Sequence, residues 1–182
     1  NGWLQHLPIF PVAVPLMAGA LMLLFKETRR LTRLGIGLVS VLIQLAAAVG
    51  LLCLTAGAVP NLWPDGIGVY LLGDWPAQFG IVVVVDRLAA IMLALSAVLG
   101  TATLVYSSVR WDRAGVHFHP LFQFLLMGLN GAFLTGDLFN LFVFFEVLLA
   151  ASYGLILHGS GTARVTAGLH YIAVNLVASL ML

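Results

Sequence analysis

The stretch that decides the fold runs from residue 137 to residue 158 and reads DLFNLFVFFEVLLAASYGLILH. Its centre is apolar and, at about 1.5 Å per helical residue, long enough to cross the hydrocarbon core of a bilayer. Glu146 interrupts this pattern roughly 13 Å along the helix from Asp137, close to the membrane midplane. An ionised carboxylate at that depth costs at least about 3 kcal/mol, and such residues usually mark ion or proton paths. Glu146 is therefore the candidate proton-exchanging residue; the alternative is a structural hydrogen bond to a neighbouring helix.

The composition of the chain is that of a membrane protein. Of its 182 residues, 62% are hydrophobic and 8% are charged, which leaves too little polar surface for a soluble domain. The formal net charge of +1 argues against a nucleic-acid partner. A single cysteine, Cys53, excludes an internal disulfide and a multi-cysteine metal site. No nucleotide-binding loop or catalytic triad pattern is present, so we expect no cofactor and no enzymatic chemistry.

Hydropathy predicts an all-α, polytopic membrane protein with six transmembrane helices, at residues 7–25, 34–57, 81–106, 120–136, 137–158 and 164–182. The first three helices form an N-terminal membrane region, residues 1–117, with an outer loop at residues 58–80. Residues 118–182 carry the other three. Because the sequence starts at an Asn and stops inside an apolar run, we expect a fragment of a longer protein, truncated at its C-terminus.

The distribution of charge predicts the orientation in the membrane. Basic residues follow the first, third and fifth helices: Lys26, Arg29, Arg30, Arg33, Arg110, Arg113 and Arg164. The loop at residues 58–80 contains Asp65 and Asp74 but neither lysine nor arginine. By the positive-inside rule the basic loops are cytoplasmic and the N-terminus lies outside.

The outer loop carries turn signals and aromatic residues. Its Pro-Asp-Gly turn at residues 64–66 predicts a short hairpin with strand character at residues 68–72. Trp63, Tyr70 and Trp75 are typical of an interfacial aromatic belt, so we expect anchoring rather than ligand binding here.

Three further charged residues lie near the outer side. Asp86 and Arg87 fall five or six residues inside the predicted third helix, where each needs a partner on another helix unless Arg87 extends outward to the interface. Structural anchoring and a place in an outer ion path are both open for this pair. Asp137 is predicted to cap the fifth helix, and only secondarily to contact a proton or cation.

The predicted sixth helix adds His170, a second relay candidate. Histidine side chains in general can gain or lose a proton near physiological pH, so a histidine close to a mid-membrane carboxyl is a natural proton carrier; a hydrogen-bonded packing role is equally open. Tyr171, Asn175 and Ser179 form a separate polar strip, which predicts hydrogen bonds between helices.

The predicted fourth helix is expected to serve packing. Gly128, Ala132 and Gly136 recur every four residues and predict a face for close helix contact, and Asn130 is expected to donate a hydrogen bond to another helix.

His117 and His119 precede that helix in a basic loop. No third ligand lies nearby, so we predict a solvated loop and no metal site.

Residues 136–159, GDLFNLFVFFEVLLAASYGLILHG, resemble the fifth transmembrane helix of the D subunit of the Mrp-type (multisubunit) monovalent cation/proton antiporters. The resemblance extends through YLLGDWPAQFGIVVVVDRLAA, which includes Asp86-Arg87-Leu88, to the final AGLHYIAVNLVASLML. This family is related to the antiporter-like, proton-pumping membrane subunits of respiratory complex I.

The resemblance implies that Glu146 is a proton-relay residue whose partner, a lysine on a seventh helix, lies outside this sequence. It implies that residues 118–182 begin the proton-channel helix repeat. It also implies a bacterial inner-membrane protein that assembles with other membrane subunits and handles protons and Na⁺ or K⁺. Relatives often have lysine at the position of His170, so the relay in this chain departs from the common pattern.

Two alternatives stay open beside an antiporter subunit. One is the equivalent subunit of a complex I-like or hydrogenase-linked redox pump, although the stretch FFEVLLAASYGL favours the antiporter type. The other is a structural membrane module without an ion path, against which the buried Glu146 and His170 argue.

Overall fold

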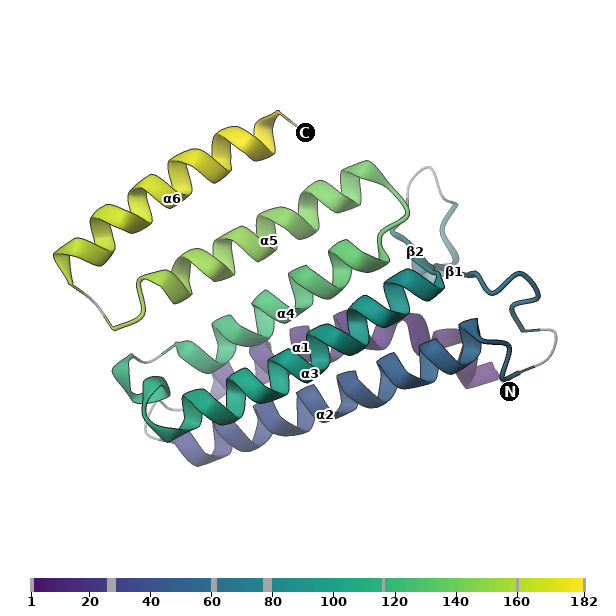
Figure 1. Cartoon of the computed structure of the whole chain (residues 1–182), viewed down its shortest axis with the longest axis horizontal. Coiled ribbons are helices and arrows are strands. Elements are labelled where there is room, and N and C mark those ends of the chain that lie inside the picture. Colours follow the sequence, from purple (N-terminus) through teal and green to yellow (C-terminus); the bar gives the residue numbers. More distant parts are fainter. Residues whose placement is uncertain are drawn as a thin grey trace.

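A computed structural model describes residues 2–25, 29–59, 62–76, 80–115, 117–159 and 161–181. The helices run along one common axis (Figure 1) and have these bounds: α1 Phe10–Leu24, α2 Arg30–Thr55, α3 Arg87–Val109, α4 Phe118–Leu134, α5 Leu138–Ile156 and α6 Thr162–Leu180. Short 3₁₀ segments precede α1 (η1, Gly2–Ile9), follow the first strand (η2, Leu72–Asp74) and follow α3 (η3, Trp111–Ala114). Helices α1 to α4 pack as a bundle, α5 packs on α4, and α6 packs mainly on α5 at the edge of the molecule.

The predicted all-α membrane fold is confirmed. Within the described residues, four helical stretches are long and apolar enough to cross a membrane: Gly2–Leu24, Arg30–Thr55, Arg87–Val109 and Leu138–Ile156. Helix α4 is a shorter apolar helix, and α6 is not among the four. The count of six spans and the outside position of the N-terminus therefore stay predictions.

A two-stranded hairpin caps the end of the bundle where α3 and α5 begin (Figure 1). Strand β1 (Gly68–Leu71) confirms the strand predicted at residues 68–72, and it pairs antiparallel with β2 (Val82–Val85). The start of the predicted third helix, at residue 81, is wrong. Four consecutive valines favour a strand over a helix because they are β-branched, and β1 supplies the partner.

The apolar core has two parts. The part beside the hairpin includes the almost fully buried side chains of Leu51, Val83, Val85, Leu93 and Leu134. The second part lies toward the other end and consists of Val41, Leu104, Phe118, Phe122 and Leu126.

Buried amides and a hydroxyl join α1, α2 and α4. Ser40 Oγ donates to Gln123 Oε1 at 2.8 Å, and Gln44 Nε2 donates to Ser40 Oγ at 3.0 Å. Asn130 Nδ2 donates to Gln44 Oε1 at 2.9 Å and to the Pro11 carbonyl at 2.8 Å, which confirms its predicted interhelical bond. These bonds satisfy most of these polar atoms in an otherwise apolar interior, where an unpaired polar group is costly; Asn130 Oδ1 has no partner among the described residues.

Glycines bring α4 and α5 into close contact. A Cβ on Gly128 would lie 2.7 Å from the Leu148 backbone nitrogen, and one on Gly131 would lie 2.2 Å from the Phe144 ring. Gly128 therefore fulfils the predicted packing role. Gly136 does not belong to that helix face, because it lies beyond the end of α4 and packs against Val84 of β2.

Candidate functional site

The N-terminus of α5 is fixed by its cap. Asp137 Oδ1 accepts a hydrogen bond from the Phe139 backbone N–H at 3.2 Å, and Oδ2 accepts one from Asn140 at 3.3 Å. The predicted cap is confirmed, and it satisfies N–H groups that have no partner within the helix. Asp137 itself is exposed, at the opposite end of α5 from the basic loops.

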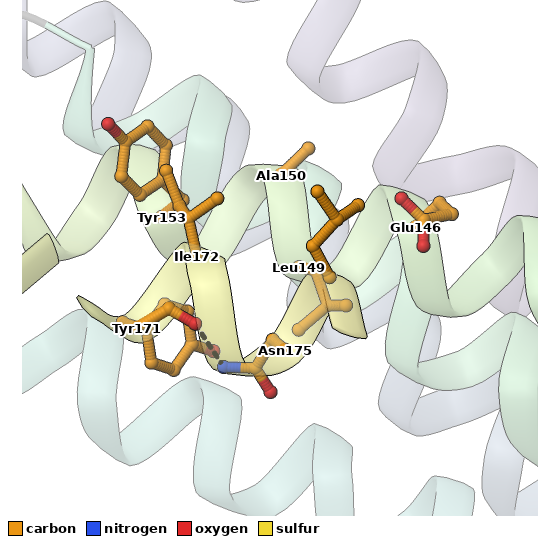
Figure 2. A pocket seen from close by; sticks show the side chains of 8 residues that line it. Glu146, Leu149, Ala150, Tyr153, Tyr171, Ile172 and Asn175 are labelled. Atoms are coloured by element: carbon orange, nitrogen blue, oxygen red, sulfur yellow. Dashed lines mark hydrogen bonds between the residues drawn. The ribbon is translucent and has the colours of Figure 1, made fainter. Parts of the chain in front are cut away.

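Glu146 lies in the middle of α5 and lines a cavity of about 180 Å³ between α5 and α6. The other lining residues are Leu149, Ala150 and Tyr153 from α5 and Tyr171, Ile172, Asn175 and Leu176 from α6. In Figure 2, Glu146 lies at one end of this row of side chains and Tyr153 at the other. The cavity therefore follows the α5–α6 seam from Glu146 toward the end of α5 that carries the basic loop.

The Glu146 carboxyl has a buried oxygen without a hydrogen bond to any described residue. Its Oε1 atom is buried and has no hydrogen-bond partner among the described residues. The cavity wall is mostly apolar, so an ionised carboxylate there is costly unless water or a cation solvates it. The volume has room for several water molecules.

Polar groups of α6 meet α5 along the same seam. The hydroxyls of Ser152 and Tyr171 share a hydrogen bond of 2.8 Å, which confirms interhelical bonding for Tyr171. Asn175 Nδ2 donates to the Tyr171 carbonyl at 2.8 Å (Figure 2). Gly168 permits the close approach, since a Cβ there would lie 3.1 Å from Leu157.

His170 lies outside this cavity. Its side chain is exposed, and its Nδ1 donates to the Thr166 carbonyl of its own helix at 2.8 Å. The structure thus brings Tyr171 and Asn175, rather than His170, to the seam that contains Glu146.

Asp86 and Arg87 lie at the start of α3. Asp86 caps the helix by accepting a hydrogen bond from the Ala89 backbone N–H at 2.7 Å, and Arg87 is exposed at the first helical position. The predicted depth inside the membrane helix is wrong, because the preceding residues are in β2. Neither residue lines the Glu146 cavity.

An ion-pair cluster at the opposite end of the bundle was not predicted. Asp112 accepts two hydrogen bonds from Arg30, of 2.7 and 3.0 Å, and its Oδ2 accepts one from His119 Nε2 at 3.2 Å. Burial by itself raises the pKa of Asp112, but the pairing with Arg30, and then with His119, lowers that pKa below its ordinary value of 3.8. The predicted solvated loop is wrong for His119, which is buried, although His117 is exposed. The sequence indicates such a cluster only by a lone acid, Asp112, between two arginines. Its partner Arg30 is 82 residues away in sequence, so the pair could not be predicted from local spacing.

At the end of the bundle that carries this cluster, residues after α5 and at the start of α6 contact η3. His158 Nε2 donates to the Trp111 carbonyl at 3.0 Å, and the Arg164 guanidinium lies 5.0 Å from the centre of the Trp111 ring. Among the described residues no group of three or more His, Cys, Asp or Glu side chains could hold a metal ion.

Known proteins resemble the chain along nearly its full length. It is 56% identical over 177 residues to the D subunit of a probable K⁺/H⁺ antiporter from Rhizobium meliloti, a match that covers 97% of this chain and 32% of the relative. It is 38% identical to the D subunit of a Na⁺/H⁺ antiporter from Alkalihalophilus pseudofirmus, over 98% of this chain and 35% of the relative. The chain is homologous to these antiporter D subunits. It spans about a third of the length of these relatives.

Structural comparison agrees with this homology. An Mrp complex from Dietzia contains a chain that superposes with a TM-score of 0.85 at 32% identity, covering 99% of this chain and 33% of that one. The N subunit of a NADH-quinone oxidoreductase from Desulforudis audaxviator is 35% identical, over 96% of this chain and 34% of the relative. No family model matches the sequence. The resemblance to Mrp-type antiporter D subunits is thus confirmed. The prediction of a multi-pass membrane protein is confirmed as well.

Proposed function

We propose that this chain forms part of the proton-translocating membrane subunit of a multisubunit Na⁺ or K⁺/proton antiporter, with Glu146 as its proton-relay carboxyl. The observation that carries the proposal is the buried Oε1 of Glu146, which has no partner among the described residues and lies at the mid-helix edge of a cavity. The homology to antiporter D subunits supports the same interpretation. In this role the chain is a transporter subunit and not an enzyme.

The seam between α5 and α6 supplies a route for the proton. Glu146 accepts a proton inside the membrane and passes it on through water in the cavity. The hydroxyl pair of Ser152 and Tyr171 lies along the seam in the direction of the basic end, and hydroxyls both donate and accept hydrogen bonds. The mostly apolar wall of the cavity disfavours counter-ions beside Glu146, which favours proton transfer along this seam.

His170 belongs to a step of the proton path beyond the Glu146 cavity. It lies on the exposed face of α6, and we assign it to a relay toward helices of a longer chain that cover this face. Asp86 and Asp137 act as helix caps at the outer side, and Arg87 anchors the chain at that interface. Six spans place the N-terminus outside a bacterial inner membrane. Other membrane subunits of the antiporter complete the assembly.

The test replaces Glu146 by Gln in the full-length subunit within its complex. Gln keeps the size and the hydrogen bonding but cannot titrate, so Na⁺- or K⁺-dependent pH change in everted vesicles should fall at least about 100-fold. Complex abundance, quantified in the same vesicles, should stay normal. Wild-type transport at normal abundance would end the relay proposal.

A matched control removes a carboxylate away from the cavity. Asp74 is exposed in the outer loop with a φ of 61°, a conformation that asparagine tolerates. Asp74→Asn should therefore transport at the wild-type rate.

The second candidate, a redox-driven proton pump, is favoured by the relative from a NADH-quinone oxidoreductase. The two candidates differ in what drives proton movement. Vesicles containing the antiporter respond to added Na⁺ or K⁺ without an electron donor, whereas a redox pump responds only to oxidation of its donor.

A further inference from the structure

We propose that an anionic phospholipid binds in the pocket beside η3. This pocket, of about 660 Å³, is lined by Tyr106, Val109, Arg110, Trp111 and Arg113. It lies where α3 ends, at the end of the bundle with the basic loops, and it shares no lining residue with the Glu146 cavity.

The charge of the pocket is positive because Asp112, the acid between its two arginines in sequence, faces inward. Asp112 lies between the two arginines in sequence, yet its side chain is fully buried and bonded to Arg30 and His119. Arg110 and Arg113 are both exposed and have no ion-pair partner within the part of the chain that the structure describes. Guanidinium groups bind phosphate oxygens strongly, often through two parallel hydrogen bonds.

The other half of the pocket is apolar. The last turn of α3 exposes 81% of Tyr106 and 76% of Val109, and α3 is apolar enough to cross a membrane. These side chains therefore lie at the depth of lipid tails, and the arginines just beyond the helix lie at the depth of the headgroups. A ligand that satisfies both halves carries a phosphate joined to an acyl chain. Free phosphate leaves the apolar half exposed.

Contacts from α6 and from the end of α5 hold Trp111 of the pocket wall in place. Trp111 has Arg164 against its ring, and its carbonyl accepts the hydrogen bond from His158. A lipid bound at Arg110 and Arg113 thus adjoins the junction between α5 and α6. Basic pockets of this kind at the ends of membrane helices suit anionic headgroups.

Photocrosslinking in the full-length complex tests the proposal. A photoreactive amino acid at Val109, in vesicles containing labelled phosphatidylglycerol, should crosslink to that lipid and not to labelled phosphatidylcholine. The double variant Arg110→Gln, Arg113→Gln should lower the yield at least tenfold. Arg29→Gln, which removes an exposed arginine from the same end outside the pocket, should leave the yield unchanged.

Further variants and competitors distinguish a lipid from inorganic phosphate or another subunit in the pocket. The variant Arg110→Lys, Arg113→Lys keeps the charge and should retain most of the crosslink, which guards against misfolding as the cause of a loss. Excess inorganic phosphate should not compete. Crosslinking to another subunit in place of lipid, competition by inorganic phosphate, or an unchanged yield in the double Gln variant would each overturn the proposal.

Discussion

The α1–α4 bundle and the α5–α6 seam differ in how most of their buried polar side chains are hydrogen-bonded, although Asn130 of the bundle also leaves its Oδ1 without a partner among the described residues. In the bundle, Ser40, Gln44 and Gln123 are almost fully buried, and each has a side-chain hydrogen bond to a neighbour. In the seam, Glu146 leaves a buried oxygen without a partner among the described residues, beside a cavity. Bonds between fixed amides stabilise one arrangement of helices. A carboxyl that must gain and lose a proton cannot be held in this way, because each protonation state needs different partners.

The largest expected effect concerns the contact that joins the two regions. Gly131→Leu places a side chain where the Phe144 ring lies, so α4 and α5 must separate. We expect the protein to be lost from the membrane, as quantified by immunoblot and by thermal unfolding in detergent. Gly35→Leu is the control, since nothing lies within 4 Å of a Cβ there. Equal abundance of the two variants would show that the α4–α5 contact is dispensable.

The next effect separates transport from stability within the seam. Glu146→Asp keeps a titrating carboxyl but retracts it by one methylene group, so we expect roughly 10-fold slower transport. The pH profile of transport should shift while the melting temperature of the complex stays near that of the wild type. Cation-dependent pH change in everted vesicles, measured across pH, checks this. A wild-type rate and profile would show that the reach of the carboxyl is unimportant.

A paired substitution compares a bundle amide with a seam amide. Gln123→Leu leaves the buried Ser40 hydroxyl without its acceptor, and should lower the free energy of unfolding by about 2 kcal/mol without changing transport per complex. Asn175→Leu should instead lower transport per complex and leave the free energy of unfolding unchanged, because Asn175 lines the Glu146 cavity. Denaturant unfolding and vesicle transport, applied to both variants, make the comparison. If one of the two variants lost more than the other in both the unfolding assay and the transport assay, the division between a structural bundle amide and a functional seam amide would be contradicted.

The smallest effect is a pH dependence of stability at the basic end. The pKa of Asp112 is lower in the folded state than its ordinary value of 3.8, so its ion pair stabilises the fold at any pH above that value. This contribution disappears as the pH falls through the lowered pKa. The stability difference between the wild type and Asp112→Asn should thus be constant from pH 7 to 8, where the neighbouring His119 is neutral, to within about 0.5 kcal/mol, and should shrink below about pH 4. A difference that changes near neutral pH would contradict this assignment.

Much of the candidate site could be predicted from sequence because its signals are local. The mid-helix position of Glu146 follows from helical rise and hydropathy, and the Asp137 cap follows from its place just before an apolar run. The start of α3 could not be found in this way. Hydropathy does not distinguish the valines of β2 from a helical turn, and only pairing with β1 decides between them.

The sequence by itself determined that this is a helical membrane protein with one carboxyl deep in its fifth helix, since composition and periodicity act over short distances. The tertiary structure decided which polar groups meet. Arg30 reaches Asp112 across 82 residues of sequence only because α2 packs beside α3. The rotation of α6 decided that Tyr171, and not its neighbour His170, faces the Glu146 cavity. Successive helical residues point about 100° apart, so packing rather than sequence position determines which of two adjacent side chains enters a site.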